Sequence, residues 1–257
     1  DPPIMCELII NSLADRVEDW TTIESIGIVE KYGDLTNALK KILVDDRKLF
    51  DLEDLQSKVT VITLNLLTVG SLKKAGWSIV RAPPDEPLLD HLKENQYDII
   101  VANPPYQDSE YKGSKTKYWQ SFLNVSLGQS LKDDGYLLFV SPDTWRSLRT
   151  TNPKGFDETP FSLLVKTNAL LDVFPRLGGF FRDRMVRWGI IVRKKPPDDD
   201  LLTAFHFPRK DNHLIEKHPL NSSEFLPRNP RSQEIDLCSR IYNQCEKYEE
   251  VKHDNQH

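Results

Sequence analysis

The most constraining feature of this sequence is a nearly continuous apolar run that ends abruptly at two prolines. Tyr97 to Ala102 reads Tyr-Asp-Ile-Ile-Val-Ala, and Asn103-Pro104-Pro105 follows directly. A strand that is apolar at successive positions is buried on both faces, as in a parallel sheet covered by helices on its two sides. Proline cannot continue such a strand, because it has no N–H for the ladder. The run therefore predicts a central strand of an α/β sheet that ends at Asn103.

Strand-like and helix-like patterns alternate on both sides of this run, which predicts a doubly wound, mostly parallel α/β sheet. The expected strands are 26–29, 59–67, 97–102, 136–141 and 185–192. The expected helices are 4–17, 35–43, 88–93 and 119–131, and residues 70–87 are expected to form a loop. The sheet signal fades after Pro196. We therefore expect an α/β domain over 1–196 and a polar, partly helical tail, or the start of a second domain, over 197–257.

Composition excludes several classes of protein. The three cysteines form no CxxC pair, which argues against a disulfide scaffold and a structural zinc site, and the histidines are scattered in the polar tail, so we expect them on a solvated surface and expect no metal. No run approaches the roughly 18 apolar residues that span a membrane, and no secretory signal is visible. We expect an intracellular protein, cytoplasmic or nucleoid-associated, that does not bind membranes. The net charge of −5 is not typical of a general nucleic-acid binder, although one basic face can coexist with an acidic back.

The end of the central strand is the expected ligand site, because open α/β sheets bind ligands at the carboxyl ends of their strands. The Asn103 side-chain oxygen and the Pro104 carbonyl can both accept hydrogen bonds from one amino group. Tyr106 offers a flat face on which a base can stack, worth roughly 1–3 kcal/mol. The alternative is an ordinary Asn-Pro-Pro turn followed by an incidental tyrosine.

The sequence of this site resembles a known family. Asn103-Pro104-Pro105-Tyr106-Gln107 after a buried strand is similar to the catalytic motif of adenine-N6 methyltransferases of restriction–modification systems. Two further segments resemble the Eco57I-like group, one around Tyr118 and Trp119 and one over 134–145. The resemblance covers roughly residues 1–195 and is strongest over 97–146.

The resemblance implies a Rossmann-like fold of the S-adenosylmethionine-dependent methyltransferase type and methylation of the N6 amino group of adenine in DNA. The adenine would be flipped out of the duplex. Asn103, Pro104, Pro105 and Tyr106 would form the catalytic motif, with S-adenosylmethionine as the cofactor and DNA as the partner. Such proteins also work in larger assemblies or fused to further domains.

The cofactor site departs from the family pattern. We find no strand followed by a glycine-rich Asp-Pro-x-x-Gly-x-Gly turn. Glu30 matches the acid that hydrogen-bonds the cofactor ribose, and Asn65 takes the place of the later acid that contacts adenine; a solvated strand-end carboxylate and an ordinary cap are their alternatives. The glycine-rich turn has diverged, or it lies in residues absent from this sequence, or the domain has lost its cofactor.

Four further residues are candidates for substrate binding. Tyr118 and Trp145 are aromatic residues close to the motif segments, with core packing as the alternative. Arg182 and Arg184 lie in a basic stretch and could contact phosphates, with an exposed loop as the alternative.

Two other functions remain open. A catalytically inactive descendant of the fold, acting as a nucleic-acid-binding or structural subunit, fits the missing glycine-rich turn and the acidic net charge. Methylation of RNA or of a protein glutamine fits the motif, because related motifs serve those amines too. An intact Asn-Pro-Pro-Tyr favours the enzyme over the inactive subunit.

Overall fold

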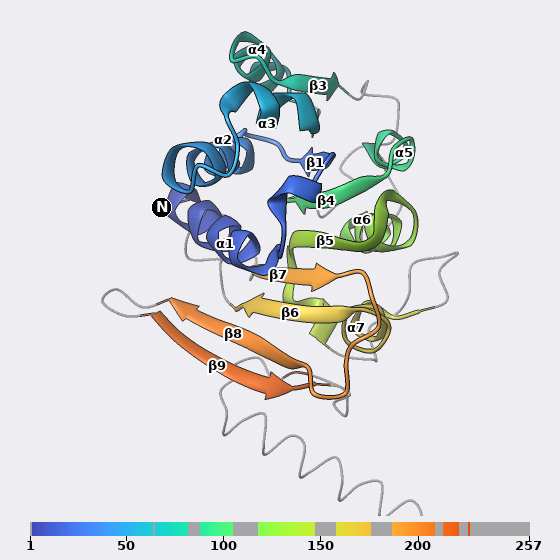
Figure 1. The fold of residues 1–257 in the computed structure, drawn as a ribbon. Coiled ribbons are helices and arrows are strands. Elements are labelled where there is room, and N and C mark those ends of the chain that lie inside the picture. Colours follow the sequence, from blue (N-terminus) through green and yellow to red (C-terminus); the bar gives the residue numbers. More distant parts are fainter. Residues whose placement is uncertain are drawn as a thin grey trace, which may run out of the picture.

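The computed structural model describes residues 2–63, 65–81, 88–104, 118–146, 158–175, 187–208, 213–220 and 226. They form one nine-stranded sheet with helices on both faces (Figure 1). The strands are β1 Ile26–Val29, β2 Val59–Thr63, β3 Ser78–Arg81, β4 Tyr97–Ala102, β5 Leu131–Pro142, β6 Ala169–Phe174, β7 Arg187–Arg193, β8 Leu202–Pro208 and β9 His213–Pro219. The α-helices are α1 Pro2–Arg16, α2 Asp34–Lys40, α3 Leu52–Lys58, α4 Leu66–Lys74, α5 Leu88–Lys93, α6 Tyr118–Val125 and α7 Pro160–Ser162.

The strand order is β3-β2-β1-β4-β5-β7-β6-β8-β9. The first five strands of this order pair in parallel, and β7 is antiparallel to both β5 and β6. The chain first moves outward from β1 to β3 and then returns to place β4 on the other side of β1. This reversal is a topological switch point, where open α/β sheets bind ligands. The expected doubly wound, mostly parallel fold is confirmed.

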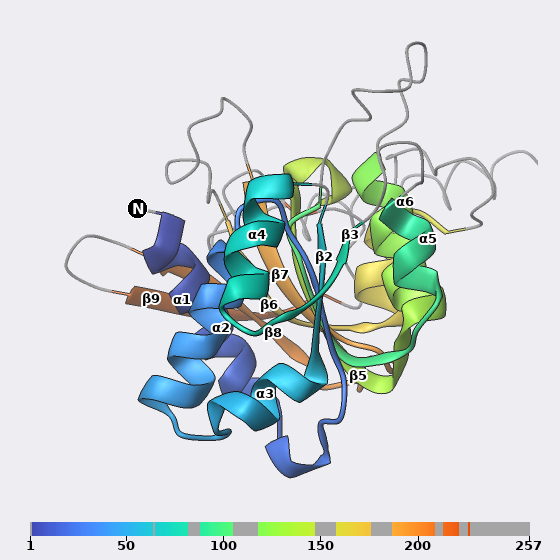
Figure 2. The same ribbon diagram turned by 90° about the horizontal axis from the view of Figure 1, so that it is seen from above.

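The sheet separates two hydrophobic cores. Figure 2 shows the helices and the sheet from above. One core contains side chains of α1 to α4, and the other contains side chains of α5 to α7. The central strand β4 serves both, because Ile99 and Val101 belong to the first core and Ile100 and Ala102 to the second. A strand in this position must be apolar at successive residues, which explains the run that dominates the sequence.

Two expectations around β2 were wrong. The strand expected over 59–67 ends at Thr63, and the region expected as a loop over 70–87 contains the end of α4 and the whole of β3. Leu72 and Trp77 anchor this region, since they are 4% and 5% exposed in the core. Gly70 lies within α4, and Gly76, with φ 90°, follows the helix and turns the chain toward β3.

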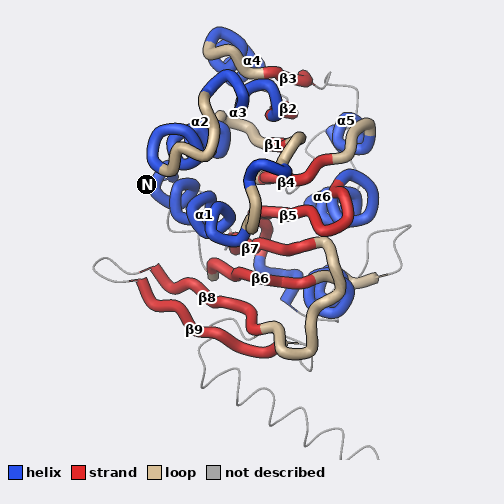
Figure 3. The backbone as a smooth tube through the Cα atoms, in the orientation of Figure 1, coloured by secondary structure: helices blue, strands red, loops and turns tan. Residues whose placement is uncertain are grey.

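The sheet continues beyond residue 196, where the sequence signal fades. Strand β8 pairs in parallel with β6, and β9 pairs with β8, so both extend the same sheet (Figure 3). The histidines His206 and His218 are 5% and 8% exposed, which corrects the expectation of a solvated surface for these two. The helix expected over 232–251 lies outside the described residues.

A buried ionic cluster fixes β8 to the rest of the fold. The Asp172 carboxylate on β6 is 1% exposed, and it accepts hydrogen bonds from Arg16 Nε at 2.7 Å and Arg16 Nη2 at 2.9 Å. His206 Nε2 lies 2.6 Å from the same carboxylate, and its ring stacks on Phe174 at 4.3 Å. Because a buried charge is tolerated only when it is paired, this cluster ties α1, β6 and β8 together.

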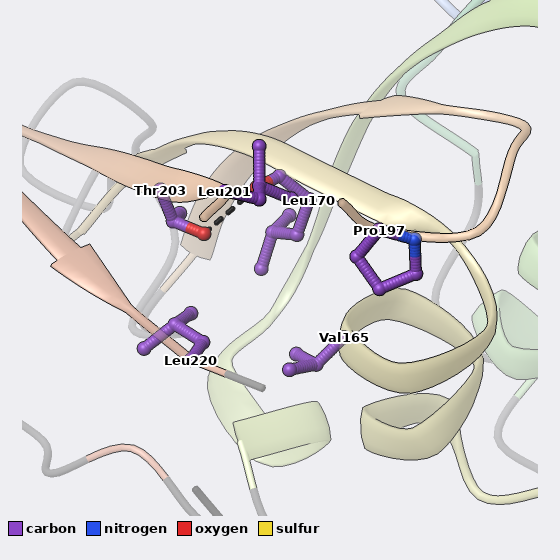
Figure 4. Close-up of a pocket in the computed structure, with 6 residues that line it drawn as sticks. All are labelled: Val165, Leu170, Pro197, Leu201, Thr203 and Leu220. Carbon is purple, nitrogen blue, oxygen red and sulfur yellow. Dashed lines mark hydrogen bonds between the residues drawn. The ribbon is translucent and has the colours of Figure 1, made fainter. Parts of the chain in front are cut away.

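The contact between β6 and β8 is closely packed. A cavity of about 10 Å³ remains beside it, near the lower limit for holding one water molecule. Figure 4 shows how Thr203 Oγ1 donates to the Leu170 carbonyl at 2.8 Å across this contact. The cavity is lined by Val165, Leu170, Pro197, Leu201, Thr203 and Leu220. Within the described part of the chain, no helix has the length and apolar character needed to cross a membrane.

We predict that Asp172→Asn lowers the free energy of unfolding by about 1–3 kcal/mol, because it weakens the hydrogen bonds that the buried Asp172 makes with Arg16 and His206. Burial opposes ionisation of Asp172, but the hydrogen bonds from His206 and Arg16 and the Arg16 charge outweigh it and lower the pKa of this carboxyl. Asp172 therefore stabilises the fold above the pKa of about 3.9 that it has when unfolded, and this stability is lost as pH falls through its lower folded pKa. Urea denaturation at several pH values measures both effects.

Asp45→Asn is the matched control. Asp45 pairs with Lys40 at 2.8 Å, but both side chains are exposed, so water screens the interaction. Equal losses for the two variants would contradict a special role for the Asp172 cluster.

Candidate functional site

The switch point brings the ends of β1 and β4 together. Val29 is paired with Ala102, and the Asn103 N–H donates to the Val29 carbonyl at 2.8 Å. The next residue of each strand, Glu30 and Asn103, therefore lie side by side at the carboxyl edge of the sheet. Two residues that the sequence places far apart are thus brought to the same edge of the sheet.

The Asn-Pro-Pro-Tyr motif begins inside the described part of the chain. Asn103 is half-buried and Pro104 is buried, both directly after β4. The backbone N–H of Asn103 is used by the β1 pairing. Pro105 and Tyr106 lie outside the described residues.

Glu30 is a buried acid that caps a helix. Its carboxylate accepts hydrogen bonds from the backbone N–H groups of Leu35 at 2.9 Å and Thr36 at 3.0 Å, and from the Thr36 hydroxyl. Gly33, with φ 84°, turns the chain from β1 into α2 so that these groups face the carboxylate. Burial raises the pKa of Glu30 although these hydrogen bonds oppose the rise. Glu30 is 6% exposed, so the alternative of a solvated strand-end carboxylate is wrong.

Asn65 caps the next helix at the same edge. Its side-chain oxygen accepts from the Leu67 N–H at 3.0 Å, which matches the ordinary capping role considered for it. A hydroxyl of Thr68, in the first turn of α4, donates to the Lys31 carbonyl at 2.7 Å and fixes α4 against the β1–α2 turn. The Asn65 amide nitrogen has no hydrogen-bond partner among the described residues, so two N–H donors remain at this edge.

These groups fit the polar parts of S-adenosylmethionine. A carboxylate has about four acceptor positions, and three donors occupy those of Glu30, which leaves room for a ribose hydroxyl. The Asn65 amide can donate to the ring nitrogens of adenine. The backbone departs from the family pattern, because the turn between β1 and α2 contains the single glycine Gly33.

Of the remaining candidate residues for substrate binding, the structure describes the side chain of Trp145 alone. Trp145 is fully buried and packs edge-on against Trp188, with ring centroids 5.7 Å apart, so its ring belongs to the core. Tyr118 begins α6, and its side chain lies outside the described residues. Arg182 and Arg184 also lie outside them.

Sequence analysis missed a set of polar atoms at the end of β5. Ser141, Trp145, Arg146 and Trp188 each hold a buried polar atom without a hydrogen-bond partner in the part of the chain that the structure describes. We call these four side chains the β5-end cluster. A serine after an apolar run and a nearby Trp-Arg pair were the only signals, and neither pattern distinguishes a site from core packing.

A cavity of about 320 Å³ lies at the opposite edge of the sheet and is separate from the candidate site. It is found at the amino ends of β4 and β5, and several of its acids are paired with neighbouring cations. Lys132 contacts Asp98 at 2.9 Å, and Arg193 contacts Glu18 at 2.8 Å.

We predict that Glu30→Ala destabilises the protein by about 1–3 kcal/mol, because it leaves the N–H groups of Leu35 and Thr36 buried without acceptors. Asp51→Ala removes a comparable cap from α3, where Asp51 accepts from the Asp54 N–H at 2.7 Å in an exposed position. Water replaces that acceptor, so we expect a smaller loss there. Denaturation curves and hydrogen exchange of the Leu35 and Thr36 amides measure the difference; faster exchange only at α3 would contradict it.

Comparison with known proteins agrees with this geometry. The family model described as Eco57I restriction-modification methylase matches residues 19–174, more than half of the chain. A protein of Methanocaldococcus jannaschii, named as a candidate type II restriction enzyme and methyltransferase, is 30% identical over 130 residues, which are 46% of this chain and 10% of that protein.

Solved structures share the fold. The type IIG restriction endonuclease BpuSI matches with a TM-score of 0.58 at 12% identity, over 85% of this chain and 30% of that one. A chain of a type I restriction–modification complex matches with a TM-score of 0.57 at 12% identity, over 95% and 50%. The M protein of the type I restriction enzyme EcoKI matches with a TM-score of 0.51 at 13% identity, over 80% and 47%. This chain thus spans about half or less of the length of these proteins. The family match extends from the end of α1 to the end of β6 and includes Glu30 and Asn103, so the chain belongs to the Eco57I restriction-modification methylase family.

Proposed function

We propose that this chain is the methyltransferase domain of an adenine-N6 DNA methyltransferase. The observation that carries the proposal is the position of Asn103-Pro104 at the switch point, beside Glu30 at the end of β1. One crevice then offers acceptors for an amino group next to polar groups suited to a nucleoside cofactor.

The chemistry follows from the hydrogen-bonding capacity of the motif. The Asn103 side-chain oxygen and the Pro104 carbonyl each accept one hydrogen of the target amino group. When both hydrogens are held, the lone pair of the nitrogen is directed along one line. S-adenosylmethionine supplies an electrophilic methyl group when bound. Alignment of nitrogen and methyl carbon within contact distance provides most of the rate enhancement, and no protein nucleophile is needed.

The cofactor would be held by the acid and the amide at the neighbouring strand ends. Glu30 would accept from the ribose hydroxyls, and Asn65 would donate to the adenine ring. Because Glu30 also caps α2, cofactor binding would stabilise the turn between β1 and α2.

The substrate in this proposal is DNA with an adenine flipped out of the duplex. The similar proteins are named as restriction enzymes and restriction–modification subunits, which supports DNA as the substrate. Those proteins are longer than this chain, so sequence recognition and cleavage would reside in other domains or in partners of a larger assembly.

A second function is favoured by one observation. The turn that holds the cofactor in the family is glycine-rich, whereas here it has the single glycine Gly33, and three donors already engage Glu30. A domain that has lost its cofactor would act as a nucleic-acid-binding or structural subunit.

We expect Asn103→Ala to keep S-adenosylmethionine binding within about twofold and to lower methyl transfer to adenine-containing DNA at least about 100-fold. Titration calorimetry measures the first quantity, and radiolabelled methyl transfer measures the second. Asn37→Ala, on the exposed face of α2, is the matched control and leaves both unchanged.

Absence of cofactor binding by the wild-type chain would contradict the proposal that it is an enzyme. It would support the second function, a nucleic-acid-binding or structural subunit. Cofactor binding with equal methyl transfer by wild type and Asn103→Ala would show that the motif does not orient the target.

A further inference from the structure

The unpaired polar atoms of the β5-end cluster bear on how the target base is recognised. Four atoms are buried without a partner among the described residues: Ser141 Oγ, Trp145 Nε1, Arg146 Nε and Trp188 Nε1. The two tryptophans are fully buried and Ser141 is 1% exposed. An unpaired buried donor costs about 1–3 kcal/mol, so four of them in one place need a physical explanation.

The four side chains form one group. Ser141 is paired with Trp188 across the antiparallel β5–β7 ladder, so their side chains lie on the same face of the sheet. The Trp188 ring packs against Trp145, and the Arg146 guanidinium lies 5.3 Å from the Trp188 ring. This face is the one covered by α5 to α7.

The group adjoins the catalytic motif. Strand β5 runs parallel to β4, with Ala102 paired to Phe139. Continuing that register by two residues places Pro104 alongside Ser141. Adjacent strands are about 4.8 Å apart, so the Ser141 hydroxyl lies within reach of a ligand held by the Pro104 carbonyl.

The cluster provides donors. An indole N–H and a guanidinium N–H can only donate, and a serine hydroxyl can do so. The other Arg146 nitrogens are engaged, Nη1 with the Leu226 carbonyl at 2.7 Å and Nη2 with Asp143 at 3.2 Å. Because Asp143 offsets the charge of Arg146, the cluster favours a neutral acceptor over an anion such as phosphate.

Adenine presents the matching pattern. Its N6 amino group donates, and the ring nitrogens beside that group accept. We propose that the β5-end cluster, through the Ser141 hydroxyl, donates a hydrogen bond to a ring nitrogen of the target adenine while Asn103 and Pro104 hold its amino group. This inference rests on the proposed function. It makes Ser141 a specificity-determining residue, and it requires the edge to open around Ser141 when the base enters.

Binding of single-stranded oligo(dA) to the full chain tests the proposal. Comparison strands carry 1-deaza-, 3-deaza- or 7-deazaadenine, each of which replaces one ring nitrogen by C–H. We expect wild type to bind one of these strands roughly 2- to 12-fold more weakly than oligo(dA), the range of one net hydrogen bond. The Ser141→Ala variant should show the same loss of affinity for oligo(dA) relative to wild type. Its affinity for that analogue strand should be no lower than its affinity for oligo(dA).

Ser130→Ala is the matched control. Ser130 is also a buried serine whose hydroxyl lacks a partner among the described residues, but it lies at the start of β5, far from the motif. It should leave all affinities unchanged. Thermal unfolding should show no loss of stability for Ser141→Ala, because its hydroxyl stabilises nothing in the free protein.

Three results would overturn the proposal. The first is a Ser141→Ala loss that is the same for oligo(dA) and for every analogue strand. The second is oligo(dA) binding by Ser141→Ala that equals that of wild type, which would mean that the buried donors bind ordered water and not the base. The third is failure of the wild-type chain to bind any of the strands, which would contradict both adenine as the ligand and the proposed function. Binding of oligo(dA) that depends on Asn103 but not on Ser141 would retain the proposed function and remove only this inference.

Discussion

The pairing of β1 with β4 is the constraint on which the rest of the molecule depends. One hydrogen bond, from the Asn103 N–H to the Val29 carbonyl, closes this pairing at the carboxyl edge. It sets Glu30 beside Asn103, and the parallel register on the other side of β4 sets Pro104 beside Ser141. A shift of the register by one residue would turn Ile99 to Ala102 to the wrong cores and separate these side chains.

The capping of α2 depends on one buried residue, Glu30, at this edge of the sheet. Glu30 is buried, and its carboxylate accepts hydrogen bonds from the N–H groups in the first turn of α2. The helix dipole makes this an electrostatically favourable place for a carboxylate. The same contacts hold it at a fixed position in the crevice. In the family, a glycine-rich turn lets the backbone approach the cofactor. In this chain, the side chain of Glu30 lies at the turn between β1 and α2 instead. Under the proposed function, the stability of α2 and the affinity for the cofactor would be coupled through this one carboxylate.

Much of the fold could be predicted from sequence, because the strands of a doubly wound sheet are short apolar runs with clear ends. The strand Tyr97 to Ala102 and its end before Asn103 were placed correctly for this reason. Strand β3 and helix α4 were missed because Gly70 and Gly76 are signals of local turns, whereas burial of Leu72 and Trp77 depends on tertiary contacts. Strands β8 and β9 were missed because their polar residues are satisfied by distant partners, as His206 is by Asp172. The β5-end cluster could not be predicted, since lack of a hydrogen-bond partner is a property of the folded state alone.

The attachment of β8 also has a consequence for how the chain can be divided. A shortened protein ending at residue 196 would keep every residue of the candidate site that the structure describes, but it would lose the strand that covers β6. The backbone N–H and C=O groups of β6 that pair with β8 would then be open to another molecule, and Asp172 would lose His206. Exposed strand edges of this kind promote intermolecular pairing. Division of the chain at residue 196 would thus expose a strand edge that the hairpin of β8 and β9 covers in the intact fold.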